Sequence, residues 1–295
     1  MNENSVSHLL LLPRFQYKAP ETLDEVCSLL DQYNGKAKVM AGGTDLLVSM
    51  KKREETPEYI ISIKNIQGLD YIKFNEGILK IGAMATLASV ANSEIVNEKF
   101  GVLAMACKKV STPQVRNMGT VAGNVAKAGP SQDTIPALLA LEAKLKLVRG
   151  VDERIIPISE FFTGPFQSIL ESNEILSEIQ VPVPPDRSAG CYLYKTKGTE
   201  MDETLAGAAV VLACDSSNQL CEDIRIGLTS VAPYPFRARK AEKMLRGNKL
   251  DENLIREVGQ AAAEETKPRS RPEYRKRMTS ILVRQAITES LNKIQ

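Results

Sequence analysis

The stretch 40-MAGGTDLLVSM-50 interrupts an apolar segment with two glycines, a threonine and an aspartate. The run before it, at 37–41, predicts a short buried strand, and 45–53 predicts a short helix. An ordinary turn between such elements needs only one residue of this kind. Two adjacent glycines beside a hydroxyl group therefore indicate a backbone that another group approaches closely, as in a loop that binds an anion.

A second glycine-rich tract at 111–133 contains the same combination, in 119-GTVAGN-124. The backbone N–H groups of two such loops could hold the two phosphates of a dinucleotide, with help from an adjoining helix N-terminus. The alternative is that each tract is a tight turn without a ligand. Neither tract matches G-x-G-x-x-G or G-x-x-x-x-G-K-[ST], so a Rossmann or P-loop fold is disfavoured.

The segments around these tracts predict a mixed fold. A helix at 22–33 with Thr22 as its cap, strands at 37–41 and 59–63 and a hairpin at 71–81 give a β-α-β-α-β opening. Further helices are predicted at 86–96, 101–110 and 136–143, with a strand at 143–148. Beyond a proline-rich boundary at 181–190 come three strands, at 190–195, 205–214 and 224–231, and a helical tail from about 237.

The composition excludes several classes of function. Of the 295 residues, 38 are basic and 36 acidic, which gives no reason to expect nucleic-acid binding. The five cysteines are widely spaced and none lies near the single histidine, His8, so we expect buried free thiols and no metal site on this chain. With one histidine, any redox or group-transfer reaction is expected to depend on a bound cofactor.

The N-terminal apolar run 9–12 is too short to cross a membrane and has no basic segment before it. We therefore expect no membrane span and no signal peptide. The cysteine usage predicts a cytoplasmic protein.

Four motifs carry a resemblance to a known family. They are 40-MAGGTDLL-47, 112-TPQVRNMGTVAGN-124, 129-GPSQDTIPALLALEA-143 and 161-FFTGP-165 with 174-EIL-176. On these residues the chain resembles, over nearly its whole length, the FAD-binding subunit of the molybdenum hydroxylases. This family includes bacterial xanthine dehydrogenases and the aerobic carbon monoxide dehydrogenases, and the 161–165 motif looks most like the xanthine dehydrogenase type.

The resemblance implies an α+β protein with an α/β-like N-terminal half. This is the two-subdomain FAD-binding fold of the vanillyl-alcohol-oxidase and molybdenum-hydroxylase flavoproteins, followed by a C-terminal α+β domain. The implied parts are 1–56 and 57–180, which sandwich the adenine and pyrophosphate, and 185–295, which covers part of the flavin. The residues that match FAD-binding positions are Val39, Met40, Ala41, Gly42, Gly43, Thr44, Asp45 and Leu46 in the first loop, Thr120, Val121, Ala122, Gly123 and Asn124 in the second, and Val110, Asp133, Ile175, Tyr194 and Lys195 elsewhere.

The resemblance also implies partners and a role in electron transfer. The molybdenum cofactor is expected on a large subunit and the [2Fe-2S] clusters on a small two-cluster subunit. FAD on this chain would accept electrons from the clusters and pass them to NAD⁺ or another acceptor. The resemblance assigns no catalytic side chain to this chain. Two alternatives stay open: a stand-alone FAD oxidoreductase similar to the enolpyruvyl-sugar reductases, and a non-catalytic anion-binding module.

Several positions have competing interpretations. Asp133 matches a residue at the cofactor's sugar, and it also stands where a helix N-cap is expected. Tyr192 and Tyr194 are expected on opposite sides of one strand, with Tyr194 at the flavin. Lys195 is interpreted as a charge beside reduced flavin or as an exposed lysine, and Arg116 as a phosphate partner or a surface ion pair. Where many relatives have Gly-Gly, this chain has Ala122-Gly123.

Overall fold

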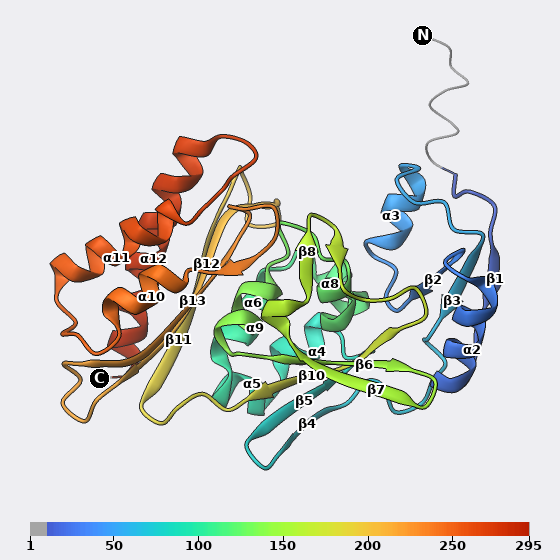
Figure 1. Cartoon of the computed structure of the whole chain (residues 1–295), viewed down its shortest axis with the longest axis horizontal. Helices are drawn as coiled ribbons and strands as arrows, with labels where there is room; N and C mark the ends of the chain where they lie inside the picture. Colours follow the sequence, from blue (N-terminus) through green and yellow to red (C-terminus); the bar gives the residue numbers. More distant parts are fainter. Residues whose placement is uncertain (1–10, 295) are drawn as a thin grey trace, which may run out of the picture.

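The computed structural model describes residues 11–294, which form three packed sheets with their helices (Figure 1). His8 and the first residues of the apolar run 9–12 lie outside the described residues. The predicted α/β-like N-terminal half, followed by an α+β part, is confirmed.

The first sheet is parallel, in the order β1-β3-β2, with β1 at Gln16–Lys18, β2 at Ala37–Met40 and β3 at Tyr59–Ser62. Helix α2 (Leu23–Tyr33) begins where predicted, because the Thr22 hydroxyl accepts a hydrogen bond from the Glu25 N–H at 3.2 Å. Helix α3 (Leu46–Lys51) follows the first glycine loop. The division into 1–56, 57–180 and 185–295 stays a prediction; in the structure, β3 joins the first sheet although it follows residue 56.

The second sheet is antiparallel, in the order β4-β5-β10-β6-β7. The predicted hairpin at 71–81 is confirmed as β4 (Ile72–Asn75) and β5 (Ile78–Gly82), and β6 (Lys144–Arg149) is the predicted strand at 143–148. The other strands are β7 at Asp152–Pro157 and β10 at Ile175–Pro182. Strand β10 pairs with both β5 and β6, so it joins the two hairpins into one sheet.

Six helices lie between β5 and β6 along the chain: α4 (Leu87–Asn92), α5 (Glu94–Lys99), α6 (Gly101–Lys109), α7 (Pro113–Met118), α8 (Val121–Ala126) and α9 (Thr134–Ala140). The segment predicted as helical at 86–96 forms two helices and not one, because Ser93 adopts an extended conformation (φ −66°, ψ 126°) that separates α4 from α5. The tract 111–133 is also more regular than its composition suggests. It contains α7 and α8, which Thr112 and Thr120 cap.

The third sheet is antiparallel, in the order β11-β12-β13-β14. Its strands are β11 at Ser188–Thr196, β12 at Thr204–Cys214, β13 at Cys221–Thr229 and β14 at Phe236–Arg237. The helical tail forms α10 (Arg239–Leu245), α11 (Glu252–Glu264) and α12 (Pro272–Ile294). Figure 1 shows α9 on one side of this sheet and α10 and α12 on the other, so α9 packs between the second and third sheets.

The remaining elements are β8 (Phe162–Gly164) and β9 (Gln167–Ser168), which form a small ribbon, and a 3₁₀ turn at Ile158–Glu160. All five cysteines are buried free thiols, which confirms their predicted packing role. Between residues 11 and 294, no helix is long and apolar enough to cross a membrane. Over the same range, no three His, Cys, Asp or Glu side chains are grouped so that they could hold a metal ion.

Candidate functional site

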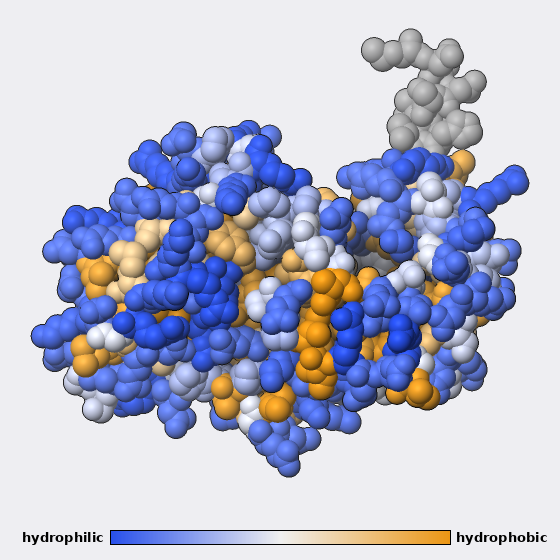
Figure 2. Space-filling view, viewed as in Figure 1, coloured by the Kyte–Doolittle hydropathy of each residue, from blue (hydrophilic) through white to orange (hydrophobic). Residues whose placement is uncertain are grey.

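A cavity of about 1140 Å³ lies between the first sheet, the helices of the second sheet and the loop that connects β11 to β12. The molecular surface is hollowed between the α3 region and the C-terminal part (Figure 2). The cavity is lined by both glycine loops, by Ile175 at the start of β10 and by residues 201–203 of the β11–β12 loop. Segments that are far apart in the sequence therefore meet at one site.

Most of the residues predicted from the family resemblance line this cavity. They are Val39, Met40, Ala41, Gly42, Gly43, Thr44, Asp45, Leu46, Val110, Thr120, Ala122, Gly123, Asn124, Asp133 and Ile175. The exceptions are Val121, which is fully buried, Tyr194, which is half-buried, and Lys195, which is exposed.

Gly42 and Gly43 are glycines for two different reasons. A Cβ on Gly42 would lie 1.9 Å from the carbonyl oxygen of Met118, so the group that approaches this backbone most closely is the second loop itself. Gly43 has φ +73°, a conformation that side-chain-bearing residues rarely adopt. A Cβ on Gly119 would in turn lie 3.1 Å from Thr44 Oγ1. The two loops are thus packed directly against each other.

Several backbone donors of these loops are not used within the protein. The N–H groups of Gly42, Gly43 and Thr44 have no hydrogen-bond partner among residues 11–294, and the same holds for the N–H of Ala122. All four residues line the cavity. Unpaired backbone N–H groups at a concave, partly buried surface form a site suited to an anion. Since α3 and α8 are only six residues long, we attribute this to the loop N–H groups rather than to the helix dipole.

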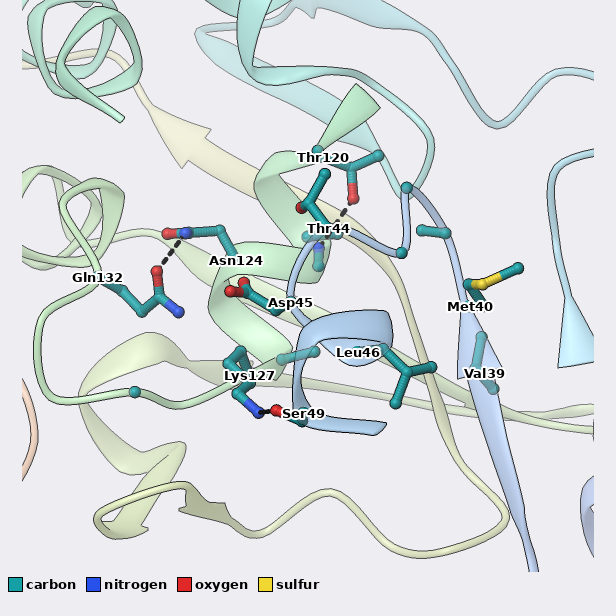
Figure 3. Close-up of a pocket in the computed structure, with 18 of the residues that line it drawn as sticks. Val39, Met40, Thr44, Asp45, Leu46, Ser49, Thr120, Asn124, Lys127 and Gln132 are labelled. Atoms are coloured by element: carbon teal, nitrogen blue, oxygen red, sulfur yellow. Dashed lines mark hydrogen bonds between the residues drawn. The ribbon is translucent and has the colours of Figure 1, made fainter. Parts of the chain in front are cut away.

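The second loop is held by side-chain hydrogen bonds. The Thr120 hydroxyl accepts the N–H of Gly123 at 2.9 Å, and the Thr134 hydroxyl donates to Asn124 Oδ1 at 2.6 Å. Lys127 Nζ, at the end of α8, donates to Ser49 Oγ of α3 at 2.9 Å (Figure 3). These contacts fix α8 against α3 and so fix the spacing of the two loops.

Asp133 belongs to a buried network and does not cap α9 with its side chain. Its Oδ1 accepts hydrogen bonds from the Tyr192 hydroxyl at 2.5 Å and from the Thr204 hydroxyl at 2.7 Å. Its Oδ2 lies 3.8 Å from Lys109 Nζ. Burial raises the pKa of the Asp133 carboxyl above its usual value, while Lys109 and the two hydroxyl donors oppose that rise. Asp133 does stand at the N-cap position of α9, as expected, but its carboxylate makes no capping hydrogen bond within the described residues; its contact with a cofactor sugar stays a prediction.

Tyr192 and Tyr194 lie on the same face of β11, which corrects the expectation that they point to opposite sides. Residues two apart on a strand share a face, and the two ring centroids are 5.9 Å apart. Tyr192 is buried against Asp133, and burial together with that carboxylate raises the pKa of its hydroxyl well above the usual value. Lys195, the next residue after Tyr194, points to the opposite face and is exposed.

Among residues 11–294, Arg116 neither lines the cavity nor forms an ion pair. Its guanidinium donates to the carbonyl oxygens of Val110 and Ser111, at 3.0 and 2.7 Å. It therefore stabilises the turn that follows α6, in which Val110 and Ser111 line the cavity.

Sequence reasoning missed several lining residues, above all Lys109, Lys127 and Gln132. No local pattern identifies them, because their role depends on contacts with α3, β11 and the β11–β12 loop.

Comparison with known protein families shows which family the chain, with its cavity-lining segments, belongs to. The family described as "FAD binding domain in molybdopterin dehydrogenase" matches residues 13–184. The chain belongs to this family. The family described as "CO dehydrogenase flavoprotein C-terminal domain" matches residues 193–290. The resemblance stated from the four sequence motifs is therefore confirmed, and the chain is an oxidoreductase subunit of the molybdenum hydroxylase type with an FAD-binding domain.

Relatives within the family match nearly the whole chain. The carbon monoxide dehydrogenase medium chain of Hydrogenophaga pseudoflava is 34% identical, covering 94% of this chain and 97% of that protein. The glyceraldehyde dehydrogenase medium chain of Sulfolobus acidocaldarius is 30% identical, with 94% and 98% covered. A solved structure of the Hydrogenophaga pseudoflava carbon monoxide dehydrogenase superposes with a TM-score of 0.91, covering 95% of this chain and 98% of that one. A putative xanthine dehydrogenase FAD-binding subunit of Escherichia coli is 28% identical, so both branches named from the sequence occur among the relatives.

Proposed function

We propose that FAD binds in this cavity, and that the chain is the electron-transfer subunit of a molybdenum-containing hydroxylase. One observation carries the proposal: two glycine loops that pack against each other line a cavity large enough for a dinucleotide, and four of their lining residues have N–H groups without a partner among the described residues. The cavity exceeds the upper end, about 1000 Å³, of the usual range for small-molecule sites. The family match supplies the identity of the ligand.

The residues present fit the parts of FAD. Under this proposal, Gly42, Gly43 and Thr44 hold one phosphate and the Ala122–Asn124 segment holds the other. Asp133 faces the cofactor's sugar region next to the ring system, Ile175 and Tyr194 lie at the ring end, and Val110 lies beside the cofactor. FAD would supply the exchange of one or two electrons. The chain would bind the cofactor, orient it and set the charges around it.

The proposed partners are a large subunit with the molybdenum cofactor and a small subunit with two [2Fe-2S] clusters. The relatives' names support a multi-subunit enzyme, since several are medium chains. Electrons would enter from the clusters and leave to NAD⁺ or another acceptor, and we expect the complex in the cytoplasm. The family match favours this role over the stand-alone oxidoreductase and over an anion-binding module without chemistry.

The test is isolation of the protein from its native source in mild buffer, with a visible spectrum and a denaturing gel of the same fraction. A flavin band together with iron–sulfur absorbance and two companion chains is the expected result. Rapid mixing of the substrate-reduced complex with NAD⁺ then shows whether NAD⁺ is the acceptor. A flavin band on a chain without companions would contradict the subunit role and favour the stand-alone enzyme.

A further inference from the structure

Lys109, the last residue of α6, is the buried lysine of the cavity wall. Its side chain is 2% exposed, although it lines the cavity. The other lysines that line the described cavity are Lys38, Lys52 and Lys127; Lys38 and Lys52 are exposed, and the Lys127 side chain is 20% exposed. A buried charge acts over a medium of low dielectric constant, so its effect on a bound ligand is larger than that of a solvated charge.

The ammonium group of Lys109 is held by three groups from the C-terminal half of the chain and from α9. Nζ donates to the carbonyl oxygen of Asp202 at 3.2 Å and lies 4.9 Å from the centre of the Tyr194 ring. Asp133 Oδ2 is 3.8 Å away. The position of the cation therefore does not depend on a ligand.

Asp133 supplies the opposite charge at the same wall. Tyr192 and Thr204 both donate to its Oδ1, so they hold the carboxylate in place from the side of the third sheet. Its Oδ2 faces Lys109, and both residues line the cavity. The result is a buried pair of opposite charges in the cavity wall, and Lys109 of this pair lies beside Tyr194, the residue that the proposed function places at the ring system.

We propose that Lys109 and Asp133 set the reduction potential of FAD bound in this cavity, with Lys109 raising the potential and Asp133 lowering it. The inference rests on the proposed function. Reduction adds electrons to the ring system, so a nearby cation favours the reduced form and a nearby carboxylate disfavours it. The pair itself exchanges neither electrons nor protons. Lys109 thus takes the role that the sequence suggested for Lys195, which is exposed and lies outside the cavity.

The test compares the midpoint potentials of FAD in the wild-type protein, Lys109→Met, Asp133→Asn and the double variant, by equilibrium titration against a reference dye. Each substitution is expected to change the ratio of reduced to oxidised FAD affinity about tenfold, or about 30 mV for two electrons. Lys109→Met should lower the potential, and Asp133→Asn should raise it. The double variant should return close to wild type, and Lys109→Arg should preserve the wild-type value.

Lys108→Met is the matched control, because Lys108 is the adjacent lysine of α6 but is exposed and bonded to Asn97 Oδ1. It should leave the potential unchanged. Shifts in the same direction for Lys109→Met and Asp133→Asn, or no shift, would overturn the inference while leaving FAD binding intact. Loss of FAD from variants at both positions would show that the pair is structural, which also overturns it. Absence of FAD from the wild-type protein would instead contradict the proposed function.

Discussion

The carbonyl oxygen of Met118 occupies the space that a side chain on Gly42 would need. This single contact joins the loop after β2 to the loop before α8, and Thr44 repeats it from the other direction by packing on Gly119. The two glycine loops therefore act as one unit, and its cavity-lining residues include four whose N–H groups have no partner in the described part of the chain. The spacing of those donors is fixed by protein–protein contacts before any cofactor is bound.

Gly42→Ala is expected to separate the loops. A Cβ placed 1.9 Å from a backbone oxygen cannot be relieved by rotating a side chain, so the backbone must move. We expect the free energy of unfolding to fall by about 1–3 kcal/mol. The FAD dissociation constant should rise at least about tenfold, which corresponds to about 1.4 kcal/mol. Urea unfolding and quenching of FAD fluorescence measure the two effects.

Gly101→Ala is the control for this change, since nothing lies within 4 Å of the added Cβ at the start of α6. It should raise stability by under about 1 kcal/mol and leave FAD affinity unchanged. Wild-type FAD affinity in Gly42→Ala would show that the spacing of the loops is unimportant.

Thr120→Ala removes the hydroxyl that caps α8 at the cavity, while Thr22→Ala removes the equivalent cap of α2, at a residue that is not among the described residues lining the cavity. Each is expected to lower the free energy of unfolding by about 1 kcal/mol. Only Thr120→Ala should weaken FAD binding, because only that cap positions a cavity loop. Parallel denaturation and FAD titration of the two variants test this; equal FAD affinities would contradict it.

Arg237 and Glu242 form a buried bidentate ion pair in the C-terminal part. Two N–O distances are 2.8 Å, and the side chains are 4% and 1% exposed. Arg237→Met is expected to lower the free energy of unfolding by about 3–5 kcal/mol, because the buried Glu242 carboxylate then keeps, among the described residues, only the N–H of Ile226 and the exposed Arg239, 3.7 Å away, as partners. Arg237→Met combined with Glu242→Leu should recover most of that loss. A double variant no more stable than the single one would contradict this explanation.

Asp215 predicts a stabilisation that is lost at low pH. A hydrogen bond from the Ser217 hydroxyl, with others from the N–H groups of Leu220 and Gln219, lowers the pKa of this carboxyl from 3.8 to about 2. Since the folded pKa is the lower one, the contribution is fully present above about pH 4 and disappears as the pH falls through about 2. Asp215→Asn should therefore be less stable than wild type at pH 6, with the difference shrinking toward pH 2. A difference independent of pH would rule out this origin.

The sequence predicted correctly those helices and strands that are determined by residues within one short segment. The Thr22 cap, the hairpin turn at Glu76-Gly77 and the apolar run of β12 each lie within one short segment, and each element formed near its expected position. The break at Ser93 was not visible, because the apolar periodicity continues across it. Strand β10 was missed as a strand because its role depends on partners that lie about 30 and 100 residues away along the chain.

The same distinction holds at the site. The glycine loops stand out in the sequence because each places glycine beside threonine between predicted helices or strands. Both loops line the cavity. Lys109 and Lys127 look like ordinary helix lysines; only the packing of α6 on β11 and of α8 on α3 turns them toward the cavity. The sequence pattern also suggested that a bound ligand is the reason why position 42 carries no side chain. In the structure, the group nearest to a Cβ at Gly42 is the carbonyl oxygen of Met118.

The central claim is that FAD occupies the cavity between the two loops. The most direct measurement is the flavin content and visible spectrum of the folded protein, isolated in mild buffer and then mixed with added FAD. The account predicts one FAD per chain, lost in parallel with the loop contact in Gly42→Ala and retained in Gly101→Ala. A folded protein that carries no flavin and takes up none would contradict the account and leave the glycine loops as turns.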